Sequence, residues 1–220
     1  MCKGAGRVFL LIEAAKKYKI KGTGITLSHE QHAEFTRRIK DLGLEDYLTV
    51  ELMDYRDLPK YHKKFDRVVS VGMVEHVGRE NYQLFIDCAR DVMNDGGLFL
   101  LHFISSLKEH PGDPWIKKYI FPGGVVPSLR EVLSAFAEDD FHTLDVENLR
   151  MHYSMTLQCW EKNFLEHLDE ERKMFDERFI RMWHLYLASC ASTFYNGIID
   201  LHQVLVSKGV NNTLPITRWY

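Results

Sequence analysis

A chain of 220 residues that is 45% hydrophobic, 12% aromatic and 27% charged can bury one sizeable core, which excludes disordered, collagen-like and small disulfide-stapled proteins. Its 28 Lys and Arg against 31 Asp and Glu give a net charge of −3, so no overall positive field favours nucleic acid or an anionic bilayer. The four cysteines lie far apart without a CxxC pair, which is typical of a reduced cytosolic protein, and we identify no metal-binding motif.

The first half of the chain alternates helical and strand-like patterns at the spacing of βα units, which predicts an α/β sheet. The apolar run at 97–104 is far shorter than the roughly 20 residues that a membrane-spanning helix needs. A helix is predicted to follow the turn Gly4-Ala5-Gly6, and no strand is predicted ahead of that turn. The predicted helices cover 8–19, 29–42 and 80–94, and the predicted strands cover 20–25, 48–53, 67–71 and 98–103.

The middle of the chain has a different character. Four prolines within 111–127 exclude a single regular element there, so we expect a long loop that carries Trp115, Tyr119 and Phe121. Beyond this loop the pattern predicts helices over 129–137, 154–167 and 169–191, and strands over 142–149 and 204–206.

Four short motifs fall at the carboxyl ends of strands or where the first strand of such a fold would end, which is where a doubly wound sheet binds its ligand. They are Gly4 with Gly6, Thr26 with Gln31, Asp54 with Tyr55, and the run from Gly72 to His76. Together they indicate a cofactor with a ribose, an adenine and an amino-acid end. The structural alternatives are an ordinary turn, a helix cap at Thr26 or Ser28, and a solvated acidic loop.

Longer stretches carry a more specific signal, because they resemble the cyclopropane-fatty-acyl-phospholipid synthases. The matching stretches are ITLSHEQ (25–31), MDYRDLP (53–59), FDRVVSVGMVEHVGRENY (65–82), GGLFLLHFI (96–104), DPWIKKYIFPGGVVPS (113–128), HYSMTLQCW (152–160) and RMWHLYLASCASTF (181–194). The resemblance covers nearly the whole chain and implies a Rossmann-like class I methyltransferase sheet, with helices on both faces, strand order 3-2-1-4-5-7-6 and a helical insertion towards the C-terminus.

The resemblance also implies S-adenosylmethionine as the cofactor. Gly4 and Gly6 would hold its methionine portion, while Thr26 and Gln31 would contact the ribose region. The remaining cofactor-binding positions that it implies are Asp54 and Tyr55 beside the adenine, and Gly72 after the fourth strand.

The chemistry of such a synthase calls for a base. An alkene attacks the sulfonium methyl with its own π electrons, and the carbocation that results must lose a methyl proton in a site sheltered from water. The resemblance implies that bound bicarbonate is this base, held by Glu75, His102, the backbone at Ile104 and Tyr153. The alternatives are a helix-capping Glu75, a satisfied core His102 and a boundary aromatic at Tyr153. Cys190 is a further candidate, although a buried cysteine on a helix is more often a packing residue.

Two features depart from the family pattern. The helical N-terminal domain, the segment with a bicarbonate-binding cysteine and the first strand have no counterpart here, and the glycine loop lacks its second glycine pair. We therefore expect residues 1–220 to be an N-terminally truncated catalytic domain, whose sheet has a gap with unpaired backbone groups where its first strand belongs.

The leading hypothesis is an enzyme that transfers a methylene group from S-adenosylmethionine to the cis double bond of an unsaturated membrane phospholipid. Such a protein is expected in the cytoplasm, peripheral at the inner face of the cell membrane, without a nucleic-acid partner, and a homodimer is left open. The alternatives are a methyltransferase of the same fold acting on another acceptor, and a truncated non-catalytic remnant.

Overall fold

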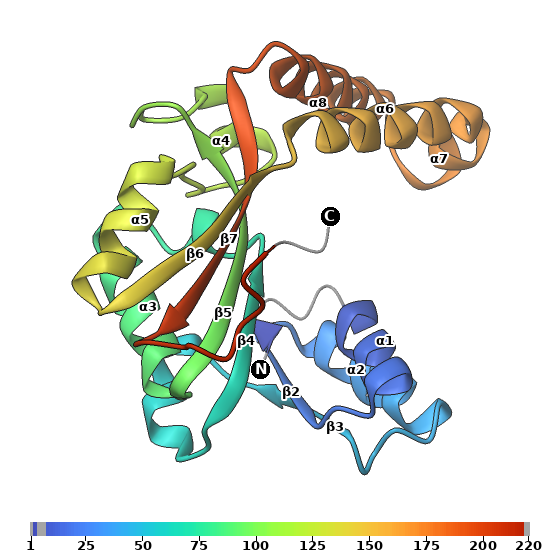
Figure 1. Ribbon diagram of the computed structural model, residues 1–220. Helices are drawn as coiled ribbons and strands as arrows, with labels where there is room; N and C mark the ends of the chain where they lie inside the picture. Colours follow the sequence, from blue (N-terminus) through green and yellow to red (C-terminus); the bar gives the residue numbers. More distant parts are fainter. Residues whose placement is uncertain (1, 4–7, 218–220) are drawn as a thin grey trace.

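The computed structural model describes residues 2–3 and 8–217, and a sheet of seven strands lies at the centre of this part of the chain (Figure 1). The strands follow the order β3-β2-β1-β4-β5-β7-β6, in which β7 runs antiparallel to both of its neighbours. The expected α/β fold and its strand order are therefore confirmed. The strand bounds are β1 (Cys2–Lys3), β2 (Gly22–Thr26), β3 (Leu48–Leu52), β4 (Phe65–Val71), β5 (Met93–Ser106), β6 (Phe141–Asn148) and β7 (Ile199–Lys208).

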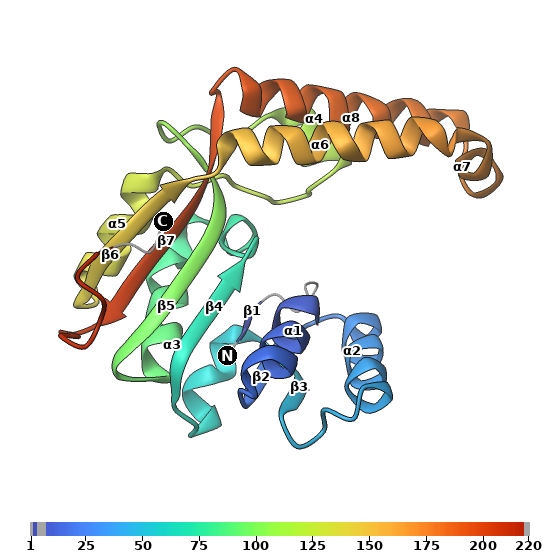
Figure 2. The ribbon, with the colours of Figure 1, turned by 45° about the vertical axis from the view of Figure 1, so that its right-hand side comes forward.

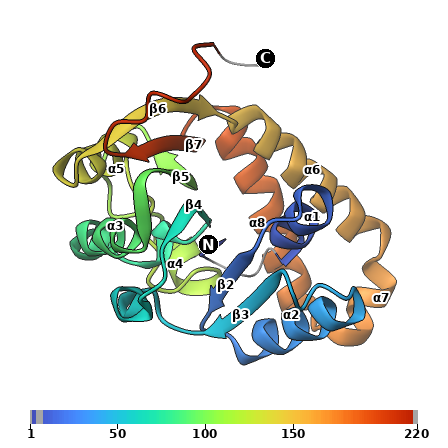
Figure 3. The ribbon, with the colours of Figure 1, turned by 60° about the horizontal axis from the view of Figure 1, so that its bottom comes forward.

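Helices cover both faces of this sheet. Their bounds are α1 (Val8–Tyr18), α2 (His29–Asp41), α3 (Tyr82–Asp91), α4 (Pro114–Tyr119), α5 (Leu129–Glu138), α6 (Arg150–Glu166), α7 (Leu168–Met174) and α8 (Glu177–Tyr195), with 3-10 turns η2 (Tyr55–Tyr61), η3 (Val74–His76) and η4 (Arg79–Asn81). Helices α1 and α2 lie beside β2 and β3, whereas α3 and α5 lie on the opposite face (Figure 3). Helices α6 and α8 form a long hairpin that projects from one end of the sheet, with α7 at its tip (Figure 2). None of the helices in the described part of the chain is long and apolar enough to cross a bilayer.

The first strand is present, which corrects the prediction of a gap in the sheet. Although β1 has only two residues, Cys2 pairs with Gly24 on one side and Val69 on the other, and Lys3 pairs with Ile25 and Ser70. These parallel pairings join β2 to β4 and occupy the central position of the sheet. A strand of two residues leaves no periodicity to detect in the sequence, and only its neighbours define it.

The predicted long loop contains a short helix, which is a second correction. The Asp113 side chain caps α4 by accepting the N–H of Ile116 at 2.9 Å, and Pro114 occupies the first helical turn. Proline is well suited to that position because its missing N–H would have no partner inside the helix. The four prolines therefore exclude one continuous helix or strand over this segment, but they leave room for a short helix between two of them.

Several other boundaries differ from the pattern, among them the start of β5 at Met93 and of α6 at Arg150, and two of the differences have a clear physical reason. The last strand extends over Ile199–Lys208 because it pairs with β5 on one side and β6 on the other, and this pairing supplies backbone hydrogen bonds whatever its side chains prefer. The predicted helix over 169–191 is divided into α7 and α8, because Phe175 is extended and the Asp176 side chain caps a new helix at the Phe179 N–H, 2.7 Å away.

The two faces of strand β5 have different surroundings: one packs in the core, and the other bears predicted site residues. Phe99, Leu101 and Phe103 are fully buried and belong to the core under α3 and α5. The residues between them point to the opposite face, since side chains alternate along a strand. His102 and Ile104 therefore share that opposite face, and Ile104 packs with residues of the α6–α8 hairpin.

Gly24 provides a test of how tightly α2 packs on the sheet. A β-carbon at this position would lie 2.9 Å from the ring of Phe35, which is 1% exposed. We expect Gly24→Ala to lower the free energy of unfolding, measured by urea denaturation, by about 1–3 kcal/mol through overpacking. Phe35→Leu removes the clashing ring edge, so the alanine should then destabilise less. Equal destabilisation in both backgrounds would show that the contact with Phe35 is not the cause.

Candidate active site

A cavity of about 900 Å³ lies between the carboxyl ends of β4 and β5, the segment 107–127 and the α6–α8 hairpin. Its polar lining residues include Gln31, Glu75, His76 and Tyr153. Much of the remaining wall is apolar or aromatic and includes Ile104, Trp115, Ile116, Leu157, Tyr186 and Phe194. A concave, mostly apolar chamber with a few convergent polar groups is the usual form of a small-molecule site.

Glu75 connects three parts of this cavity. It lies in η3, directly after β4, and is only 8% exposed. Its Oε1 atom accepts the backbone N–H of Ile104 at 2.8 Å, and its backbone carbonyl accepts the N–H of Val125 at 2.8 Å. A carboxylate held between β5 and the segment 107–127 therefore has a defined orientation beside the cavity. The Ile104 N–H, predicted to contact bicarbonate, donates to Glu75 in this structure.

His102 lies next to residues that line the cavity but does not line it itself. Its Nδ1 atom is 3.1 Å from the amide nitrogen of Gln203 on β7, and its carbonyl oxygen accepts the N–H of Gly72 at 2.9 Å. The ring shares a face of β5 with Ile104 but does not belong to the lining of the cavity among the described residues. The structure thus places His102 beside the site, where cross-strand pairing with Gln203 orients its ring.

Tyr153 reaches the cavity from the hairpin. Its ring packs edge-on against Phe194 of α8, with centroids 4.8 Å apart, and more loosely against Trp160, at 6.2 Å. Such edge-to-face contacts fix the plane of the ring and leave the phenol at a boundary. The structure therefore brings together Glu75, Ile104 and Tyr153, which come from three separate elements, on the wall of one cavity.

Cys190 also lines this cavity, from α8. Burial raises the pKa of its thiol to about 11, so the group is protonated at neutral pH. A protonated thiol is a weak nucleophile and no base. Its environment supports the alternative of a packing residue.

The raised pKa of Cys190 predicts slow alkylation. At pH 8 we expect iodoacetamide to modify Cys190 at least about tenfold more slowly than the exposed Cys159, because thiolate content falls tenfold for each unit of pKa. Mass spectrometry of peptides from a time course measures both rates in one sample. The Cys190 rate should rise as the pH approaches 11. Equal rates at pH 8 would contradict a buried, protonated thiol.

Three predicted cofactor residues lie at the same edge of the sheet. Gln31 lines the cavity, and the Thr26 hydroxyl donates to its Oε1 atom at 2.7 Å, so Thr26 orients Gln31 from the end of β2. Gly72, at the end of β4, has φ +59° and also lines the cavity. A β-carbon on Gly72 would meet no atom within 4 Å, so open space lies next to its backbone. A ligand can approach the chain closely at such a glycine.

Asp54 and Tyr55 follow β3 but do not line the cavity in the described part of the chain. Asp54 caps η2, and its hydrogen bond to Arg56, 2.6 Å at the closest, lowers the pKa of the carboxyl. Tyr55 is 8% exposed and packs edge-on against Phe85 in the core, where burial raises the pKa of its phenol. The last two predicted positions, Gly4 and Gly6, lie outside the described residues.

Some cavity residues were not singled out from the sequence. Leu157 lies one turn after Tyr153 on α6, and Tyr186 and Phe194 lie one turn either side of Cys190 on α8. This spacing of four residues puts each set on one helical face, which is a signal that the sequence does contain. It does not separate a cavity wall from an ordinary core face, because both require apolar side chains.

Comparison with known proteins finds relatives at 40% identity. A probable fatty acid methyltransferase of Pseudomonas putida is 40% identical over 215 residues, covering 93% of this chain and 54% of the relative. The cyclopropane-fatty-acyl-phospholipid synthase of Escherichia coli K12 is 40% identical over 205 residues, covering 93% of this chain and 52% of the relative. The chain thus spans about half the length of the curated relatives it matches.

Solved structures agree with these relatives. The cyclopropane synthase MmaA2 from Mycobacterium tuberculosis matches with a TM-score of 0.86 and 26% identity, over 94% of this chain and 77% of that chain. The mycolic acid cyclopropane synthase CmaA1 complexed with SAH and CTAB matches with a TM-score of 0.86 and 27% identity, over the same shares. The family model of the mycolic acid cyclopropane synthetases matches residues 3–204. The chain therefore belongs to the mycolic acid cyclopropane synthetase family.

Proposed function

We propose that residues 1–220 form the catalytic part of an enzyme that transfers a methylene group from S-adenosylmethionine to the cis double bond of an unsaturated phospholipid acyl chain, forming a cyclopropane. The observation that carries this proposal is the cavity of about 900 Å³, in which a buried carboxylate and a phenol face apolar walls. An acyl chain needs such walls, and proton removal beside it needs such polar groups. The 40% identity to the synthase of Escherichia coli supports the same substrate.

The residues at the sheet edge fit the cofactor. Gly72 leaves open space beside its backbone, and Gln31 presents an amide oriented by Thr26. In our proposal Gln31 hydrogen-bonds the ribose region while Gly72 admits the ligand to the backbone. The bound cofactor supplies an electrophilic methyl group. The complex of CmaA1 with SAH supports this assignment.

We also propose that bicarbonate binds beside Glu75, where it would supply the base. Because the Ile104 N–H donates to Glu75, we assign the contacts to side chains. The phenol of Tyr153 can donate a hydrogen bond, and the imidazole of His102 can donate or accept one according to its tautomer. In this proposal Glu75 accepts a hydrogen bond from the bicarbonate hydroxyl, next to the carbon that loses its proton.

The cavity walls have two further roles in this proposal. Leu157 and Phe194 exclude water, which would otherwise capture a carbocation. Tyr153, Tyr186 and Phe121 also line the cavity, and aromatic faces stabilise positive charge within about 6 Å. No protein nucleophile is required, because the alkene supplies the electrons that form the new bond.

A membrane location follows from the proposed substrate. Three apolar residues that line the cavity are also exposed, namely Phe121 (41%), Leu185 (54%) and Ile198 (65%). Exposed apolar residues around a cavity support peripheral contact with a lipid surface. We therefore propose that the protein lies in the cytoplasm and contacts the inner face of the cell membrane.

A second candidate is methylation of a lipid without ring closure. Two relatives favour it: the probable fatty acid methyltransferase of Pseudomonas putida, at 40% identity, and a sphingolipid C9-methyltransferase of Candida albicans, at 30%. The two reactions differ in which proton the carbocation loses. Loss from the transferred methyl closes the ring, whereas loss from a chain carbon leaves a methyl-branched alkene.

Both candidates are tested with the full chain, methyl-labelled S-adenosylmethionine and vesicles of a cis-monounsaturated phospholipid, with saturated vesicles as the control. We expect label in the unsaturated lipid alone, cyclopropane proton resonances in the product, and a lower rate after bicarbonate is removed. Vinylic methyl resonances would support the second candidate. Calorimetric binding of S-adenosylhomocysteine without labelled lipid would indicate another acceptor, and an absence of binding would overturn the proposal.

A further inference from the structure

The segment 107–127, here called the cavity segment, joins β5 to α5 and supplies one wall of the cavity through Trp115, Ile116 and Phe121. Its two ends meet at a closed base. The N–H of Ser106 donates to the carbonyl of Pro127 at 2.8 Å, and Ser106 forms a bridge with Ser128. Because the two ends of the segment are joined to each other, the position of its cavity-lining residues depends on the contacts made by the residues between those ends.

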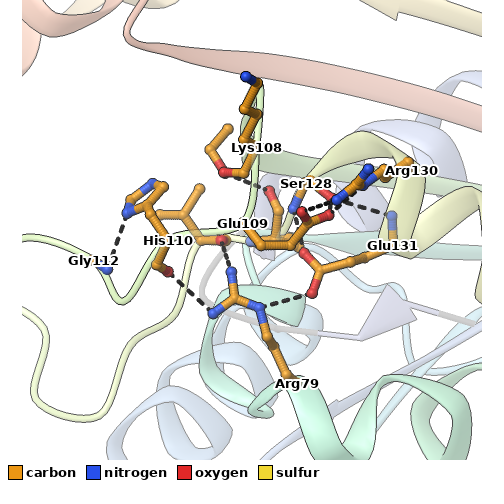
Figure 4. Close-up of polar contacts among 11 residues, drawn as sticks. Arg79, Lys108, Glu109, His110, Gly112, Ser128, Arg130 and Glu131 are labelled. Carbon is orange, nitrogen blue, oxygen red and sulfur yellow. Dashed lines mark hydrogen bonds and ion pairs between the residues drawn. The ribbon is translucent and has the colours of Figure 1, made fainter.

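Arg79 holds both sides of the cavity segment (Figure 4). From η4, its Nη1 atom donates to the carbonyl of His110 at 3.1 Å, on the outgoing side, and its Nη2 atom donates to the carbonyl of Val126 at 3.2 Å, on the returning side. Its Nε atom donates to Oε1 of Glu131 at 2.7 Å. One guanidinium therefore joins the two sides of the segment to each other and to α5.

Glu131 is itself firmly held. Its second oxygen accepts the N–H of Ser128 at 2.7 Å, and the Ser128 hydroxyl accepts the N–H of Glu131 at 3.2 Å, which forms a capping box at the start of α5. Glu109 also contacts Ser128 and Arg130, but the Arg130 side chain is 78% exposed. Exposed ion pairs contribute little, whereas the Arg79 and Glu131 side chains are 31% and 21% exposed. The hydrogen bonds of Arg79 therefore hold the segment more strongly than the exposed ion pair of Arg130 with Glu109 does.

These contacts reach Glu75 through the backbone. Val125, next to the residue that Arg79 holds, donates its N–H to the carbonyl of Glu75 at 2.8 Å. Arg79 does not line the cavity itself. We propose that Arg79 is a positioning residue, which fixes the cavity segment relative to Glu75 and so sets the shape of the acyl-chain site. The kinetic part of this inference rests on the proposed function, whereas its structural part does not.

Arginine is required for this role by geometry. A guanidinium has five N–H donors in a rigid planar fork, so it can contact three acceptors that lie in different directions. A lysine ammonium carries its donors on one atom and cannot reach the carbonyls of His110 and Val126 and the carboxylate of Glu131 together. Arg79→Lys therefore keeps the charge and loses the cross-link.

Trypsin digestion of the full chain tests the structural part. Lys117 and Lys118 lie in α4 within the segment, so cleavage after them requires local opening. We expect Arg79→Lys to speed this cleavage by roughly tenfold or more, because two or three hydrogen bonds no longer oppose opening. The matched control is Arg90→Lys. Arg90 lies on α3, its side chain is 36% exposed, and it pairs at 2.6 Å with Asp139 at the C-terminal end of α5. Trypsin should cleave the segment of Arg90→Lys at the same rate as that of the wild type.

Steady-state kinetics with unsaturated phospholipid vesicles test the kinetic part of the inference. A displaced wall weakens acyl binding, so Arg79→Lys should raise KM roughly tenfold while kcat changes less. Unchanged trypsin cleavage, or an equal increase in Arg90→Lys, would overturn the inference. Should Arg79→Lys not fold, Glu131→Gln is digested in its place and is expected to give a smaller but still selective increase, because the two carbonyl contacts of Arg79 remain. If the wild type does not act on phospholipid, the proposed function fails and the digestion still decides the role of Arg79.

Discussion

Glu75→Gln is expected to reduce kcat/KM for cyclopropane formation by about 10²–10⁴-fold, the range typical of a lost acid–base group. The amide of glutamine can still accept the Ile104 N–H, which Glu75 accepts at 2.8 Å, so the backbone of β5 and η3 should keep its arrangement. What is lost is the second carboxylate oxygen as a hydrogen-bond acceptor beside the proposed base. The measurement is methyl transfer from labelled cofactor to vesicles of a cis-monounsaturated phospholipid.

The control for this substitution is Glu45→Gln, which makes the same chemical change at an exposed position and should leave the rate unaltered. Calorimetric titration with S-adenosylhomocysteine should give similar affinities for Glu75→Gln and the wild type, because the role proposed for Glu75 concerns the base and not the cofactor. Activity of Glu75→Gln within about threefold of the wild type would remove Glu75 from the acid–base chemistry.

Gly72→Leu is expected to weaken S-adenosylhomocysteine binding by roughly two orders of magnitude, which corresponds to about 3 kcal/mol. Gly72 lines the cavity, and no atom lies within 4 Å of the place where its β-carbon would be. A leucine there would occupy space that we assign to the cofactor. Isothermal titration calorimetry measures the change in Kd directly.

Backbone strain is a separate consequence of this change and needs its own control. Gly72 and Gly43 have φ +59° and +61°, and neither has an atom near its absent β-carbon. Leucine at either position meets a similar left-handed strain of about 1–2 kcal/mol. Gly43 lies after α2, away from the cavity, so Gly43→Leu should lower stability by a similar amount and leave binding unchanged. Equal loss of binding in both variants would assign the effect to strain.

The alternation of patterns along the chain was a good guide to the fold. β5 shows why: Phe99, Leu101 and Phe103 are fully buried, and a run this apolar has few other places in an α/β domain. The resemblance to a known family added the strand order. The pattern failed at β1 and α4, where two residues and six residues are too few for a period to emerge.

The structure brings some of the predicted site residues together and leaves others apart, and the reason is geometric. Glu75, Ile104 and Tyr153 were identified by their surrounding motifs, and the structure puts all three on one cavity. Tyr55 came from an equally clear motif and is a core residue against Phe85. A motif identifies a position at the end of a strand, but the direction of its side chain depends on the elements packed against it.

The sequence by itself determined the alternation of helices and strands, the apolar faces that form the core, and the motifs that place this chain among the cyclopropane synthetases. Those features are local, since propensity and periodicity act over a few residues. Only the tertiary structure decided that a two-residue strand completes the sheet, that His102 pairs with Gln203 beside the cavity, and that Arg79 joins His110 to Val126. These are contacts between residues distant in the sequence, and they exist only once the chain has packed.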